Sequence, residues 1–290
     1  MKRLINKIKS TLNPQWNNPR KTSKLNLLTT FSSFKPHGNQ SYESFVPLLI
    51  KNINEVIPRI AEISELKNKV DVVNYLAYFE ENKNKNSENI KEKLIENFNL
   101  RGSDKVGNNY HMVYSCLLED LEKDYTILEI GLGTNNPKIV SSMGVTGSPG
   151  ASVRAFRDTF LNGYIYGADV DPDILFSEER ISTFFVDQNN FDTFSNIPKL
   201  LDNKFDLIID DGLHYQLSNL NTLIFALSNL NKGGYFIIED IGVWTIDTWK
   251  IVKNLIPDNF ESRIIQMTES NFIFLVKKIT QNNVALTKTS

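Results

Sequence analysis

From residue 125 onward, short apolar runs alternate with segments of helical periodicity, and this alternation restricts the possible folds more than any other feature. Strands are expected at 125–130, 164–169, 181–186, 205–209 and 235–238. Helices are expected at 151–160, 217–230 and 245–255, and two last strands, 263–267 and 272–277, are expected to form an edge hairpin. The pattern predicts an α/β, doubly wound (Rossmann-like), mostly parallel seven-stranded sheet. Ligands of such sheets bind at the carboxyl ends of the strands.

The first hundred residues differ in character. Helices are expected over residues 43–66, 70–79 and 90–98, and Pro58 is expected to break or kink the first of them. Residues 80–87 resemble a polar linker, and residues 1–40 are expected to be loop with short helices. We therefore expect a helical accessory region over 1–98 and a ligand-binding α/β domain over 99–290.

Composition excludes several classes of protein. The chain of 290 residues has 32 Lys and Arg against 34 Asp and Glu, a net charge of −2, so a nucleic-acid-binding surface is not expected. It has no run of about 18 consecutive apolar residues, and the basic N-terminus lacks the apolar core of a secretory signal. We therefore expect no membrane span and a cytoplasmic protein. The single Cys116 excludes a disulfide framework and a Cys-based zinc site.

A glycine turn follows the first strand of the α/β part. Gly131 and Gly133 let the backbone turn tightly and approach a ligand closely. A dinucleotide fingerprint would place a third glycine where Asn136 stands, and the next helix begins only near Ala151, so a nicotinamide dinucleotide is disfavoured. A simple turn at the strand exit is the alternative for the glycines alone.

Two acidic residues end the next two strands. Asp169 is placed to accept the hydroxyl hydrogens of an adenosine ribose, and Asp187 is placed to meet an adenine amino group. Either residue alone would be interpreted as a solvated aspartate. Together with the glycine turn, they favour an adenosine-containing ligand.

The most specific feature is a set of acidic residues after the fourth and fifth strands. Asp211, Glu239 and Asp240 are expected to converge, and oxygen-only ligands suit Mg²⁺. His214 is positioned to act as a general base near neutral pH. The alternative is that the aspartates are helix caps or turn residues and that His214 is a surface residue. Neither motif contains Lys or Arg, which favours the metal.

Residues 101–278 resemble a known family, the class I S-adenosylmethionine-dependent methyltransferases. The glycine turn, Asp169, Asp187 and Asp210 at the end of the fourth strand carry this resemblance. The pattern Asp211-Gly-Leu-His214 with Glu239-Asp240 is similar, more narrowly, to the metal-dependent sugar O-methyltransferases of macrolide biosynthesis, the mycinamicin type. Further similarity to that type lies in Ser103-Asp104-Lys105 followed by Tyr110 and Tyr114, and in 147–154 with Arg157-Asp158. Leu213 departs from the pattern, because a small Ser often stands there.

The resemblance implies a role for each site residue. Asp211, Glu239 and Asp240 would bind Mg²⁺, and His214 would be the base. The residues implied to bind S-adenosylmethionine are Glu129, Gly131, Gly133, Asp169, Asp187 and Asp210.

The function that the resemblance implies is Mg²⁺-dependent O-methylation of a sugar hydroxyl. The acceptor is expected to be a sugar on a nucleotide carrier, a surface-polysaccharide precursor or a natural-product glycoside, and a homo-oligomer is left open. Three alternatives remain: an NAD-dependent oxidoreductase on the same kind of sheet, a catechol-type O-methyltransferase and a non-catalytic binding protein.

Overall fold

The structure is a computed structural model, and it describes residues 42–197 and 204–280, with side chains from residue 46. The chain divides into two compact units, with the boundary after Ile63. Helix α3 (Tyr42–Lys67) continues without interruption through Pro47 and Pro58, so Pro58 does not break it, and the kink that we gave as the alternative stays a prediction. The expectation for residues 1–40 lies outside the described residues.

The second unit is built on one sheet of nine strands in the order β1-β8-β9-β7-β6-β2-β3-β5-β4. The strands are β1 (Val72–Asn74), β2 (Thr126–Ile130), β3 (Tyr164–Asp169), β4 (Ser177–Glu178), β5 (Ile181–Phe185), β6 (Phe205–Asp210), β7 (Leu230–Gly242), β8 (Phe260–Gln266) and β9 (Asn271–Lys278). Pairing is parallel except where β9 joins β7 and β8 and where β4 joins β5. Chain order reverses beside β2, since β3 lies on one side of it and β6 on the other.

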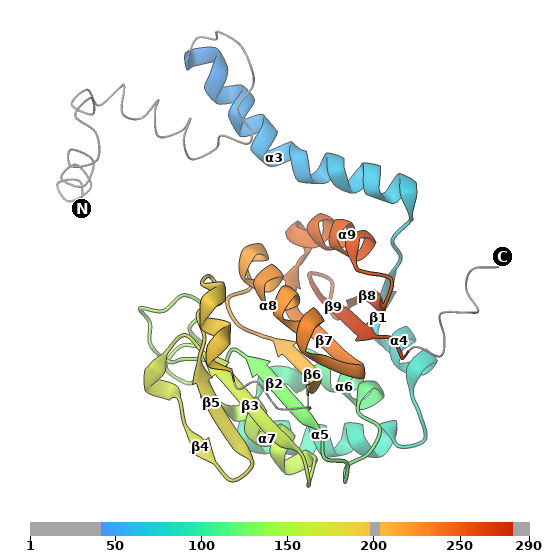
Figure 1. The fold of residues 1–290 in the computed structure, drawn as a ribbon, viewed down its shortest axis with the longest axis vertical. Helices are drawn as coiled ribbons and strands as arrows, with labels where there is room; N and C mark the ends of the chain where they lie inside the picture. The colour runs from blue at the N-terminus through green and yellow to red at the C-terminus, as the bar shows by residue number, and fades with distance from the viewer. Residues whose placement is uncertain (1–41, 198–203, 281–290) are drawn as a thin grey trace. The chain divides into compact units, whose positions relative to one another are not determined.

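Helices cover both faces of this sheet (Figure 1). They are α4 (Tyr75–Asn82), α5 (Ser87–Arg101), α6 (Tyr110–Leu117), α7 (Ala151–Thr159), α8 (Gln216–Asn229) and α9 (Ile246–Leu255). One apolar core is formed by helices α4, α5, α6 and α7 together with every second strand residue, such as Ile127 and Ile209. The other core is formed by α8 and α9 together with the strand residues that alternate with the first set, such as Leu128 and Ile208. Successive side chains of a strand alternate between the two faces of the sheet. The position of each acidic residue in its strand therefore determines which face it occupies.

The expected fold class is confirmed, and the differences lie in short elements. The sheet gains β4 and β1 over the seven strands that we expected. Residues 70–79 do not form one helix, because the β-branched Val72 and Val73 pair in parallel with β8 before α4 begins. The final hairpin is therefore not at the edge. Within residues 42–197 and 204–280, no helix combines the length and the apolar character that a membrane crossing requires.

Candidate active site

A cavity of about 310 Å³ opens at the carboxyl ends of the strands where the chain order reverses. The loops after β2, β3, β5 and β6 line it with Ile130, Gly131, Gly133, Thr134, Ile139, Val140, Ser141, Asp169, Val170, Val186, Asp187, Gln188, Asn189, Asp211, Gly212 and Leu213. This is the position at which open α/β sheets bind ligands. Of the predicted cofactor residues, Gly131, Gly133, Asp169 and Asp187 line it.

Gly131 allows the end of β2 to approach the end of β6 closely. Its φ is +102°, and a Cβ there would lie 2.0 Å from the carbonyl oxygen of Asp211. Only glycine fits this position, for reasons of both space and conformation. The glycine turn therefore brings the two loops of the site together, in addition to leaving room for a ligand.

Asp169 stabilises the glycine turn from β3. Its Oδ2 accepts a hydrogen bond from the backbone N–H of Leu132 at 2.8 Å, and its Oδ1 accepts one from Asp171 at 2.9 Å. Burial raises the pKa of Asp169, and these backbone hydrogen bonds oppose the rise. Each carboxylate oxygen keeps a lone pair, so the residue is both part of the turn and an acceptor at the cavity wall.

Asp210 lies apart from the cavity. It follows Ile209 on β6, so the strand alternation directs its side chain to the face covered by α8. There it is fully buried, and it accepts hydrogen bonds from Gln188 Nε2 at 2.7 Å and from Asn219 Nδ2 at 3.0 Å. Gln188 also accepts a hydrogen bond from the backbone N–H of Leu213 at 2.8 Å. Asp210 therefore supports the turn between Asp211 and His214 from below.

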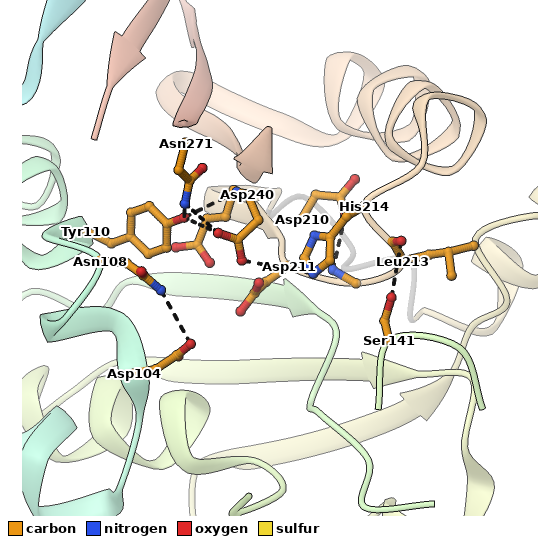
Figure 2. A network of polar contacts seen from close by, with 12 residues as sticks. Asp104, Asn108, Tyr110, Ser141, Asp210, Asp211, Leu213, His214, Asp240 and Asn271 are labelled. Carbon is orange, nitrogen blue, oxygen red and sulfur yellow. Dashed lines mark hydrogen bonds and ion pairs between the residues drawn. The ribbon is translucent and has the colours of Figure 1, made fainter. Parts of the chain in front are cut away.

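A second cavity, of about 330 Å³, adjoins the first. The two share Gly131, Gly133, Ser141, Asp211 and Gly212. The wall of the second also contains residues 102–105, Leu132, Met143, residues 146–148, Ala151, Ser152, His214 and Asp240. Ser141 joins the inserted segment 137–150 to the turn after β6, because its hydroxyl donates to the carbonyl of Leu213 at 3.2 Å (Figure 2). Asp211 thus lies where the two cavities meet.

A buried lysine occupies the centre of the acidic cluster. Lys105, on the 3-10 helix η3 (Asp104–Val106), has a side chain that is only 1% exposed. Its Nζ lies 2.6 Å from Glu239 Oε2, 2.8 Å from Asp211 Oδ2 and 3.0 Å from Glu129 Oε1. Glu129 and Glu239 follow Leu128 and Ile238, so the alternation of β2 and β7 directs both toward this lysine on the α4–α7 face.

The remaining oxygens of the two glutamates are also bound. Tyr114 donates its hydroxyl to Glu239 Oε1, and Ser152 donates to Glu129 Oε2. Burial raises the pKa of both glutamates, well above the ordinary value for Glu239, and Lys105 opposes the rise. The positive charge of Lys105 offsets the free-energy cost of burying these carboxylates away from water.

Asp240 points to a different place from Glu239. The register between β7 and β9 shifts between Ile238 and Ile241, and Asp240 has a φ of +54°. A bulge of this kind redirects a side chain. Asp240 Oδ1 accepts hydrogen bonds from the Tyr110 hydroxyl and from Asn271 Nδ2, both at 2.6 Å (Figure 2).

His214 faces the same space as Asp240. Its Nε2 lies 4.0 Å from Asp240 Oδ2, and both side chains are about one-third exposed (Figure 2). His214 has a φ of +57°, so each of these neighbours has a conformation that non-glycine residues rarely adopt. Such conformations cluster at functional sites.

The donor set fits a divalent ion. Within the described residues, two groups have ligand atoms within 4.8 Å of one another: Asp211 with His214 and Asp240, and Glu129 with Asp211 and Glu239. The combination of Asp211, Glu239 and Asp240 that we expected is not such a group, because the bulge separates its last two members. Three carboxyl groups face one ammonium, and Asp240 lies close by, so hard oxygen donors remain for a cation.

The sequence reasoning missed the residues that hold these carboxylates. It found no basic residue in the two acidic motifs, whereas the structure supplies Lys105 from a segment 106 positions before Asp211. The family resemblance includes Lys105, Tyr110 and Tyr114 but implies no role for them. It is the one sequence feature that pointed to these residues. Nothing in the sequence indicated Asn271 or Gln188.

Comparisons with curated proteins give relatives of one kind. The chain is 26% identical over 142 residues to 8-demethyl-8-alpha-L-rhamnosyl tetracenomycin-C 2'-O-methyltransferase of Streptomyces olivaceus, covering 48% of this chain and 35% of that protein. It is 31% identical over 125 residues to demethylmacrocin O-methyltransferase of Streptomyces fradiae, covering 42% of this chain and 28% of that protein. It is 32% identical to mycinamicin VI 2''-O-methyltransferase of Micromonospora griseorubida, covering 33% and 23%. The aligned parts thus span about a third or less of these relatives. No family profile matches the chain.

Among solved structures, the MycE methyltransferase from the mycinamycin biosynthetic pathway superimposes with a TM-score of 0.51 and 21% identity, covering 68% of this chain and 57% of that one. The fold is that of a class I methyltransferase. That crystal structure is a complex with Mg and SAH, and a second one also holds mycinamycin VI. The predicted resemblance to macrolide sugar O-methyltransferases is confirmed, since the relatives carry those names.

Proposed function

We propose that this chain is a divalent-metal-dependent S-adenosylmethionine O-methyltransferase that acts on a sugar hydroxyl. The observation that carries the proposal is the meeting of two cavities at Asp211, with His214 and Asp240 in the wall of the second. One cavity suits an adenosyl cofactor and the other an acceptor, so the methyl group and the attacking oxygen would meet at their junction.

The first cavity would bind the cofactor. Asp169 would accept hydrogen bonds from the ribose hydroxyls, and Asp187 would accept one from the adenine amino group. The sulfonium would lie at the glycine turn, because Gly131 and Gly133 line both cavities. A complex with SAH in the superimposed methyltransferase supports this assignment.

The carboxylates of the second cavity would hold the metal ion. Asp211 and Asp240 each have one oxygen fixed by a neighbour, which leaves the other for a ligand, and Mg²⁺ in the MycE complexes supports the choice of ion. A divalent ion lowers the pKa of a hydroxyl that it binds. Glu239, the third expected ligand, lies beneath this pair against Lys105.

His214 would then act as the general base. In the reaction the sugar oxygen attacks the methyl carbon in line, the bond between that carbon and sulfur breaks, and the hydroxyl proton passes to Nε2 of His214. The products are a methyl ether and S-adenosylhomocysteine. Positioning of the two reactants across the junction would contribute most of the rate gain.

The acceptor class follows from the relatives. Their names specify hydroxyls of sugars on polyketide-type products, which favours a glycoside among our three expected acceptors. No relative supports a role in polysaccharide biosynthesis. We also propose a cytoplasmic location, since S-adenosylmethionine is made there.

Methyl transfer from labelled donor to a set of diol-bearing glycosides tests the proposal. We expect transfer that stops with EDTA and resumes with Mg²⁺, and calorimetry should detect S-adenosylhomocysteine binding but no NAD binding. Transfer to catechol instead of sugars would favour the catechol alternative. NAD binding without S-adenosylhomocysteine binding would contradict the proposal.

The role of His214 has its own test. The His214→Gln variant should lose turnover by about 100-fold or more, in line with removal of a general base. Its affinity for S-adenosylhomocysteine should stay unchanged. The matched control is His111→Gln, because His111 lines neither cavity. Normal turnover of His214→Gln would exclude His214 as the base.

A further inference from the structure

The cage around Lys105 has the composition of a metal site but holds an ammonium. The group of Glu129, Asp211 and Glu239 has its ligand atoms within 4.8 Å of one another, and the Nζ of Lys105 lies within 3.0 Å of all three residues. The ammonium donates hydrogen bonds to Asp211 and Glu239, and it forms an ion pair with Glu129. We call these three carboxylates the inner cage. Asp211 and Asp240 form the outer set, and His214, the proposed base, lies beside them.

The lysine is not free to leave the inner cage. Its side chain is 1% exposed, it starts from a short helix capped by Ser103, and its Nζ lies 5.9 Å from the centre of the Tyr110 ring. Its departure would leave three carboxylates together, two of them fully buried, without a counter-charge. The protein therefore has a permanent cation at a position where a metal would otherwise bind.

We propose that Lys105 acts as this resident cation, so that the chain binds a single divalent ion, in the outer set. Lys105 is a positioning residue: it holds Asp211 by Oδ2, so that the other oxygen can bind the ion. Glu239 then acts through Lys105, because Tyr114 and Lys105 occupy its two oxygens. The inference rests on the proposed function for the existence of the ion.

Mn²⁺ titration of the protein without cofactor or acceptor, followed by electron paramagnetic resonance, tests where the ion binds. Wild type should bind one Mn²⁺. The isosteric variant Asp240→Asn should weaken binding at least about tenfold more than Glu129→Gln does, because only Asp240 would touch the ion. Equal or larger loss in Glu129→Gln would place the ion in the inner cage and overturn the proposal. Two ions or none in wild type would overturn it as well.

Removal of the lysine tests its role as a cation. Lys105→Ala opens the inner cage, so this variant should bind a second Mn²⁺, and the added Glu239→Gln change should return the number to one. The matched control is Lys93→Ala, whose side chain is 51% exposed and pairs with Glu96, and it should bind one ion. A folded Lys105→Ala protein with one ion would contradict the proposal, and if that variant does not fold, the isosteric variants decide.

The two proposals fail in different ways. A wild-type protein that binds one Mn²⁺ in the outer set but transfers no methyl group would count against the proposed function alone. A protein that transfers methyl groups while Glu129→Gln abolishes Mn²⁺ binding would count against the role of Lys105 alone.

Discussion

At the scale of single residues, the glycine after β2 has the strictest requirement in the site. Gly131 has a positive φ and faces the Asp211 carbonyl, whereas Gly144 has a φ of +75° and nothing within 4 Å of an added Cβ. A substitution at Gly144 therefore measures the free-energy cost of a left-handed backbone alone, whereas one at Gly131 adds the cost of a steric clash.

Gly131→Ala should abolish binding of S-adenosylhomocysteine and destabilise the fold, while Gly144→Ala should cost only about 1–2 kcal/mol of unfolding free energy, the cost of a left-handed residue. The reason is that the added methyl group at 131 must displace the backbone of the β6 loop. Urea unfolding and calorimetric titration measure both effects. Equal behaviour of the two variants would mean that the close approach of β2 to β6 is unimportant.

His111 predicts a dependence of stability on pH. Burial lowers its pKa below the ordinary value of 6.5, and hydrogen bonding with the backbone of Lys105 opposes the shift. The unfolded chain therefore binds the proton more readily, so the unfolding free energy falls as the pH falls below about 6.5.

Unfolding by urea at pH 7.5, 6.5 and 5.5 checks this sign. Wild type should lose stability faster than His111→Gln over that range, and the difference in slope cannot exceed one proton, about 1.4 kcal/mol per pH unit. Parallel slopes would show that His111 keeps its ordinary pKa in the fold.

The sequence predicts chemistry well at this scale where a residue stands beside its partners along the chain. The turn from Asp211 to His214 is an example, since a span of four residues brings both to one cavity wall. Lys105 is the opposite case. Its contacts depend on three different strands, and a local motif contains no information on which lysine the fold will bury.

At the scale of elements, strand alternation separates residues that are adjacent or similarly placed in sequence. Asp210 and Asp187 both follow apolar strands and both were expected to bind the cofactor. The structure places Asp187 at the cavity and Asp210 on the α8 side. The strand period was available from the sequence, but the exact end of β6 was not. The bulge that separates Glu239 from Asp240 also depends on pairing with β9, which a single strand's sequence does not specify.

The two aspartates give a paired prediction. Asp210→Asn should lower the unfolding free energy by about 1–3 kcal/mol, because the new amide would face the amide donors of Gln188 and Asn219. The folded variant should keep its affinity for S-adenosylhomocysteine. Asp187→Asn should do the reverse and weaken that affinity by about tenfold, or ~1.4 kcal/mol, with little change in stability. Unfolding and calorimetry measure both quantities, and a loss of affinity in Asp210→Asn would return this residue to the cofactor site.

At the scale of the whole molecule, the alternation of strands and helices was sufficient to predict the layered fold and the end of the sheet that carries the site. It was not sufficient to place residues 64–98, which we expected in a helical accessory region. Strand β1 pairs with β8, where Val72 lies opposite Ile264, 192 positions later, and α5 packs against α7. The partners of residues 64–98 lie too far along the chain for sequence periodicity to reveal the contacts. The sequence therefore predicts a separate region there, although these residues belong to the second unit.

This division predicts which part of the chain is enough to bind the cofactor. Every residue that lines the two cavities belongs to the unit from Ser64 onward. A variant that begins at Ser64 should therefore fold and should bind S-adenosylhomocysteine with a dissociation constant within about threefold of the full chain, less than ~0.7 kcal/mol. Starting at Ser64 keeps the hydrogen bond from Asn254 to the Ser64 hydroxyl, at 2.7 Å, which a start at Asn68 would remove. Circular dichroism measures folding, and calorimetry measures binding, for this variant and for the full chain. A folded Ser64 variant that cannot bind S-adenosylhomocysteine would mean that residues before 64 complete the cofactor site.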